Sequence, residues 1–171
     1  GPKPCEQVKK SSLTAIKELV THYDAVAVRE QDTASLLNQI ANIKVQVVLD
    51  PTLLINPQEW TALAGKEPLI KENYIFLYTP WHKEYKSLFT SALKLAKQHN
   101  FKIICSLPDN AYLWRNEPNI QFYTAVGPIE FLNLVKNSKY MFCGSYHAVV
   151  FSILFNKPFF AYDGMNDSRI A

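Results

Sequence analysis

Apolar residues along the chain form short continuous runs that alternate with segments of helical periodicity. Because strands buried on both faces are apolar throughout, these runs predict strands of a mostly parallel sheet. The alternation therefore predicts an α/β fold, a Rossmann-like sheet with helices on both faces. Strands are expected at 25–28, 45–49, 74–78, 101–105, 120–123, 140–143 and near 159–161, and helices over 6–22, 32–40, 82–99 and 128–137, with a short one following Ser145.

Two breaks bear on the domain organisation. Asp50-Pro-Thr stops the second predicted strand, and segment 56–71, with two prolines and Gly65, is expected to be loop or broken helix. One α/β domain is expected over 1–171. Within it, residues 1–50 either join the main sheet or include the linker between two lobes. The chain stops after Asp167-Ser-Arg-Ile without a closing helix, so we interpret it as a fragment of a longer protein.

Local signals predict several details of these elements. The run at 25–28 is expected to be a buried strand, and Asp32 or Thr33 is expected to cap the helix that follows it. Gly144 is expected to serve the backbone geometry of the turn that follows 140–143.

Composition excludes some function classes. The 171 residues are 48% hydrophobic and 19% charged, as in ordinary globular proteins. The net charge of +3 comes from scattered basic residues, so no nucleic-acid partner is expected, although an anionic small molecule would suit it. The longest apolar run, near 148–155, is far short of the roughly 20 residues that a membrane span needs.

Cysteine usage favours a reducing compartment. The three cysteines, Cys5, Cys105 and Cys143, are odd in number and lack the spacing of a metal site. Cys105 and Cys143 lie in apolar runs and are predicted to be buried free thiols. We therefore expect a cytoplasmic protein, with peripheral association at the inner membrane face as an alternative, and no bound metal.

The densest chemistry lies at Gly144-Ser145-Tyr146-His147, between an apolar strand and a short apolar helix. This arrangement places an imidazole, a hydroxyl and a helix N-terminus at the carboxyl end of a strand. Open α/β sheets bind ligands at such ends, and helix N-termini favour anions. The residues alone thus predict an anion site beside a titratable group.

Several segments together resemble the polysaccharide pyruvyl transferase family. These are AVAVRE at 25–30, VVLDPTLL at 47–54, GPIEFL at 127–132, SYH at 145–147 with FSILFNKPF at 151–159, and DSRI at 167–170. The resemblance implies a two-lobed enzyme similar to GT-B glycosyltransferases. Such an enzyme moves a pyruvyl group from phosphoenolpyruvate onto a pair of sugar hydroxyls in surface polysaccharide biosynthesis.

The resemblance also implies what this chain would do. It would be the C-terminal, donor-binding lobe, partnered by an N-terminal lobe of the same protein and inactive alone. Phosphoenolpyruvate would be the donor substrate and a sugar or lipid-linked saccharide the acceptor, with no cofactor. Two alternatives stay open: a GT-B glycosyltransferase lobe that uses a nucleotide sugar, and a non-catalytic module that binds phosphosugars or carbohydrates.

Site roles follow from the same resemblance. His147 would protonate the donor's methylene carbon or hold its phosphate. Ser145 would donate to a phosphate oxygen or only cap the helix. Some members carry an arginine at the position of Ser145, so Arg29 and Arg169 become the candidates to bind the anion.

The remaining candidates have structural readings as well. Glu130 would touch the donor or simply favour the positive end of its helix. Asp50 is expected to form a turn. Trp81 and Trp114 are the aromatic residues that would line a cleft.

Overall fold

The computed structural model describes residues 9–79, 85–106 and 116–162. The chain divides into two compact units, residues 1–54 and 55–171, which are described separately.

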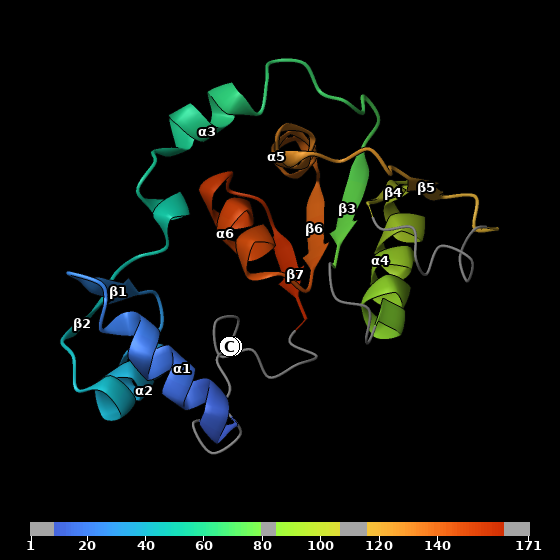
Figure 1. Ribbon diagram of the computed structural model, residues 1–171. Coiled ribbons are helices and arrows are strands. Elements are labelled where there is room, and N and C mark those ends of the chain that lie inside the picture. The colour runs from blue at the N-terminus through green and yellow to red at the C-terminus, as the bar shows by residue number, and fades with distance from the viewer. Residues whose placement is uncertain (1–8, 80–84, 107–115, 163–171) are drawn as a thin grey trace. The chain divides into compact units, whose positions relative to one another are not determined.

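The second unit is built on a parallel sheet of five strands (Figure 1). Its strand order, β5-β4-β3-β6-β7, places the first strand in the centre, as in a doubly wound Rossmann-like sheet. Each strand lies within a residue or two of its predicted position, and the predicted α/β fold is confirmed. The strands are β3 (Tyr74–Tyr78), β4 (Lys102–Cys105), β5 (Ile120–Phe122), β6 (Tyr140–Cys143) and β7 (Phe159–Ala161).

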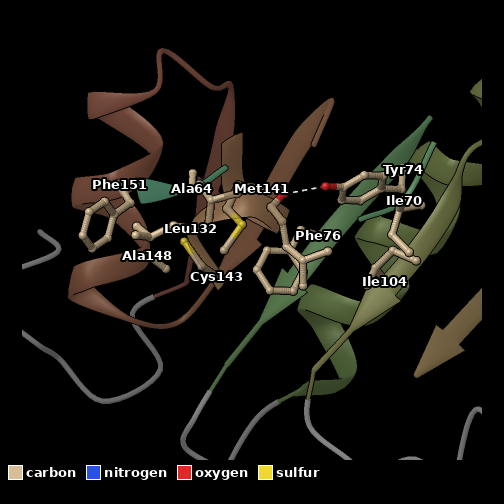
Figure 2. Close-up of a cluster of buried hydrophobic side chains, with 12 residues drawn as sticks. Ala64, Ile70, Tyr74, Phe76, Ile104, Leu132, Met141, Cys143, Ala148 and Phe151 are labelled. Atoms are coloured by element: carbon tan, nitrogen blue, oxygen red, sulfur yellow. Dashed lines mark hydrogen bonds between the residues drawn. The ribbon is translucent and has the colours of Figure 1, made fainter. Parts of the chain in front are cut away.

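Helices cover both faces of this sheet because alternate strand residues point to opposite sides. Phe76, Ile104 and Met141 face a cluster completed by residues of α5 (Pro128–Asn137) and α6 (Tyr146–Leu154) (Figure 2). On the opposite face, Ile75, Ile103 and Phe142 pack against Leu88, Phe89 and Ala92 of α4 (Tyr85–His99). The strands are therefore buried on both sides, as their continuous apolar runs predict.

Two buried polar side chains tie distant segments of this unit together. The Tyr74 hydroxyl donates to the Leu134 carbonyl at 2.8 Å, joining β3 to α5. The Asn133 amide donates to the carbonyls of Ala64 and Glu67 at 2.7 and 2.8 Å and accepts from the Leu69 N–H at 3.0 Å. The segment after α3 (Pro57–Leu63), predicted as loop or broken helix, is thereby fixed to α5.

The first unit contains a separate parallel pair of strands, β1 (Val26–Val28) and β2 (Val45–Val47). It also holds the helices α1 (Lys10–Val20) and α2 (Gln31–Ala41) and a short 3-10 helix, η2 (Pro51–Leu53). In the described chain these strands do not join the five-stranded sheet. The assignment of residues 1–50 to an inter-lobe segment stays a prediction.

Two expectations for this unit are wrong. Strand β1 is half-buried or exposed along its length. At the end of β2 and just after it, Val47, Val48 and Leu49 are 46%, 45% and 64% exposed. Strand burial needs cover on two faces, and among the described elements the extensive packing on both strands comes from α2. The helix α2 also begins at Gln31, with Glu30 as its N-cap residue and no side-chain cap, so neither Asp32 nor Thr33 caps it.

Candidate functional site

The turn between β6 and α6 lies where the strand order reverses. From β3 the chain adds β4 and β5 on one side and then returns to add β6 and β7 on the other. The Gly144 N–H donates to the Tyr78 carbonyl at 3.2 Å, so the turn rests against the carboxyl end of β3. Ligands of open α/β sheets bind at such a reversal point.

Ser145 and His147 are held by the first turn of α6. The first intrahelical bond runs from the Val149 N–H to the Ser145 carbonyl at 3.1 Å, so the helix dipole places partial positive charge over 145–148. Ser145 is the N-cap residue of α6, as predicted, but its side chain makes no cap bond. His147 is exposed, with its ring edge-on to Tyr146 at a centroid distance of 5.3 Å.

The turn itself differs from expectation at Gly144. Its backbone is not in the left-handed region, and a Cβ placed there would meet Thr79 Cβ and the Tyr162 carbonyl oxygen at 3.6 Å, an ordinary contact. The expected geometric need for glycine is therefore wrong. Next to it, the buried thiol of Cys143 confirms the sequence prediction, and burial raises its pKa to about 12 against the opposing effect of the Ser145 backbone N–H.

Glu130 lies at the same edge of the sheet, because helices that follow parallel strands begin at the carboxyl edge. Its carboxylate Oε2 accepts from the Gly127 N–H at 3.0 Å across the first turn of α5. A Cβ on residue 127 would lie 2.8 Å from that oxygen, so glycine makes room for the contact. This hydrogen bond gives Glu130 a structural role, and a contact between Glu130 and the donor stays a prediction.

Arg29 belongs to the first unit, where it pairs with Asp50. Asp50 is 3% exposed and its Oδ1 accepts from the N–H and hydroxyl of Thr52 at 2.9 and 2.7 Å. Burial alone would raise the pKa of Asp50. The bonds from Thr52 and the charge and hydrogen bond of Arg29 outweigh it and lower that pKa to about 2. The turn role expected for Asp50 is confirmed.

Sequence reasoning missed that Asp50 is the partner of Arg29. The two residues follow paired strands, in which Val28 lies beside Val47, so both come at the carboxyl ends of β1 and β2. Their shared position at that edge is the sequence signal that could have predicted the pair. Arg169, Trp81 and Trp114 lie outside the described residues, so their expected roles stay predictions.

Two further polar residues at the edge of the main sheet were also missed. Thr79 and Ser106 directly follow β3 and β4, and both are buried. No motif marks them, because a single Ser or Thr after a strand is common in turns. In the described part of the chain, no group of His, Cys, Asp or Glu side chains forms a metal site, and no helix is long and apolar enough to cross a membrane.

Comparison with solved structures gives the fold a wider context. The UDP-GlcNAc 2-epimerase of Methanocaldococcus jannaschii superposes with a TM-score of 0.60 at 16% identity, covering 84% of this chain and 48% of that one. Its complex with UDP-GlcNAc and UDP gives 0.57 at 17%, covering 84% and 47%. The UDP-N-acetylglucosamine 2-epimerase of Rickettsia bellii gives 0.56 at 16%, covering 83% and 43%.

These likenesses show a fold of GT-B type, and this chain spans about half the length of each solved structure. No match was found among curated protein sequences. The family model for polysaccharide pyruvyl transferase, in contrast, matches residues 6–164 and so covers nearly the whole chain. The chain belongs to the polysaccharide pyruvyl transferase family.

Proposed function

We propose that this chain binds phosphoenolpyruvate at the turn between β6 and α6, and that the longer protein to which it belongs transfers the pyruvyl group to a pair of sugar hydroxyls. The observation that carries the proposal is the position of His147. It is exposed in the first turn of α6, at the point where the strand order of the sheet reverses. A family whose name specifies pyruvyl transfer needs a proton donor beside an anion site, and this turn supplies both.

The chemistry requires one proton at the donor's methylene carbon. His147, as imidazolium, gives that proton to C3 of phosphoenolpyruvate, and C2 becomes an oxocarbenium-like centre. One sugar hydroxyl attacks C2, phosphate leaves, and the second hydroxyl closes the ketal. Of the two hydroxyl protons, one restores His147 and the other leaves with phosphate. An imidazole suits this exchange because its ordinary pKa lies near neutral pH.

The donor's anionic groups need positive charge. The N-terminus of α6 offers its dipole, and the Ser145 hydroxyl, which makes no cap bond, is available to donate to a phosphate oxygen. Arg29 is paired with Asp50 in the first unit, and a contact between Arg29 and the donor stays an expectation. Arg169 is the second candidate cation, and Glu130 orders the start of α5 at the same edge.

The acceptor side is proposed to lie in an N-terminal lobe. The chain spans about half the length of the solved structures that share its fold, and in a two-lobed enzyme the acceptor faces the donor across a cleft. The acceptor would be a sugar or a lipid-linked saccharide in the cytoplasm. The chain alone is therefore expected to bind the donor without turnover.

The test uses the full-length protein and compares His147→Ala with His99→Ala. His99 is also exposed but ends α4, at the opposite edge of the sheet. We expect His147→Ala to lower the rate of ketal formation at least a hundredfold, and His99→Ala to leave it unchanged. Product is followed by mass spectrometry and phosphate release. Ketal formation by His147→Ala at the unsubstituted rate would refute the assignment.

A nucleotide sugar is the second candidate donor, because one solved neighbour binds UDP-GlcNAc and UDP at a similar fold. Thermal shift separates the two. Phosphoenolpyruvate is expected to raise the melting temperature of the protein and UDP to leave it unchanged. The reverse result would favour a glycosyltransferase.

A further inference from the structure

Ser106 carries a buried hydroxyl that the fold does not use. The residue is 7% exposed, and among the described residues its Oγ has no hydrogen-bond partner. The other two buried serines of the described chain are both paired: Ser138 donates to the Val135 carbonyl at 2.9 Å and Ser152 to the Ala148 carbonyl at 2.7 Å. A buried hydroxyl without a partner destabilises the protein that carries it, so its presence needs an explanation.

The strand register places Ser106 at the ligand-binding edge. Leu77 of β3 pairs with Cys105 of β4, and Tyr78 pairs with Cys143 of β6. Ser106 is thus level with Tyr78 and Cys143, one residue before the level of Gly144. It directly follows the strand beside β3, on the side away from β6.

Ser106 lies on an apolar face of the sheet, where packing of the core does not require a hydroxyl. Ile104, two residues earlier, points into the apolar cluster under α5 and α6, and the alternation of β4 sends Ser106 to that same side. Cys143 and the half-buried Tyr78 line this side as well. Alanine would fill such a place without leaving a polar atom unpaired.

We propose that the Ser106 hydroxyl donates a hydrogen bond to an oxygen of the phosphorylated donor bound at this edge. The proposal rests on the proposed function for the donor's identity, and it adds a binding residue contributed by β4. In this arrangement the hydroxyl is unpaired in the free protein and becomes paired when donor binds. Ser106 then contributes to donor binding rather than to the stability of the fold.

Two variants of the full-length protein test the proposal, Ser106→Ala and the matched control Ser138→Ala. Calorimetric titration with phosphoenolpyruvate gives the Kd, and thermal unfolding without ligand gives the Tm. We expect Ser106→Ala to raise the Kd about tenfold and to keep or raise the Tm, because it removes an unpaired hydroxyl. We expect Ser138→Ala to keep the Kd and to lower the Tm, because it removes a made hydrogen bond.

Either of two results would overturn the inference. One is an unchanged Kd in Ser106→Ala. The other is a Tm lowered as far as in Ser138→Ala, whatever the Kd, because that would reveal a partner within the protein. Ser106→Cys, with a weaker donor of similar size, is expected to give an intermediate Kd.

Failure of the proposed function is separately visible. If the unsubstituted protein binds UDP and not phosphoenolpyruvate, the proposed donor is wrong, and the same comparison of Kd values is made with UDP. If it binds neither, the hydrogen bond from Ser106 to a donor is overturned together with the proposed function.

Discussion

The two parallel sheets of this chain are made of similar apolar strands but differ in their cover. In the second unit, Ile75, Phe76 and Leu77 of β3 are fully buried between helices on both faces. In the first unit, Val47 and the two residues after it, Val48 and Leu49, leave about half of their surface exposed. A continuous apolar run therefore predicts a strand suited to burial, whereas burial itself depends on neighbours that the run does not specify.

The difference predicts unequal responses to truncation of an apolar side chain. Phe76→Ala is expected to lower the free energy of unfolding by about 3–5 kcal/mol, because it empties a site in a filled core. Val48→Ala is expected to cost within about 0.5 kcal/mol, because half of its surface already meets water. Urea unfolding of the two variants measures both values. Equal losses would mean that the two sheets do not differ in cover.

For ion pairs the order is reversed, and the larger loss of stability is expected in the first unit. Arg29→Met is expected to cost about 3 kcal/mol, because it leaves the Asp50 carboxylate buried without its cation. The matched change in the second unit is Lys102→Met, which removes an exposed partner of Glu72 at 2.7 Å and should destabilise the protein far less. The free energies of unfolding from urea titration compare the two. A larger loss for Lys102→Met would reverse the ranking.

Acid is expected to act on the first unit through Asp50. The pKa of this carboxyl is about 2 in the folded protein, against an ordinary 3.8. Its contribution to stability is therefore complete above about pH 4 and is lost as the pH falls toward 2. A carbon-detected NMR titration of the Asp50 carboxyl in the intact chain should give a midpoint near 2. A midpoint close to 3.8 would show that the pairing with Arg29 and Thr52 is not formed in solution.

The smallest effect is expected at Gly144. Gly144→Ala should change the free energy of unfolding by within about 0.5 kcal/mol, because a Cβ there makes only ordinary contacts with Thr79 and the Tyr162 carbonyl. Gly65→Ala is the contrasting variant. Its φ of +81° strains an alanine, so we expect it to cost about 1 kcal/mol. Thermal unfolding of both variants makes the comparison, and a Gly144 cost above that of Gly65 would contradict it.

How well the sequence predicted each region follows the same contrast. The bounds of β3 were predicted to the residue, because its apolar pattern and its burial agree. At β1 and β2 the strands were predicted correctly but their burial was not, since burial depends on elements elsewhere in the protein.

The site shows a similar division. The turn carrying His147 was placed correctly by the strand–helix signal around it. The pairing of Arg29 with Asp50 joins residues 21 positions apart and needed the register of β1 and β2. Ser106 was missed because the absence of a partner is a property of three-dimensional surroundings and leaves no mark in sequence.

The strand order also determines when the site is assembled. The central strand β3 acquires its neighbour β4 early in synthesis. Strand β6, on its other side, is made about 60 residues after β3, a delay of roughly 3–12 seconds during translation. Until then one edge of a fully apolar strand has no partner within its own sheet. Docking of β6 closes that edge and places His147 in the same event. A nascent chain stalled before residue 140 would therefore lack the candidate site and expose an unpaired apolar strand edge to chaperones.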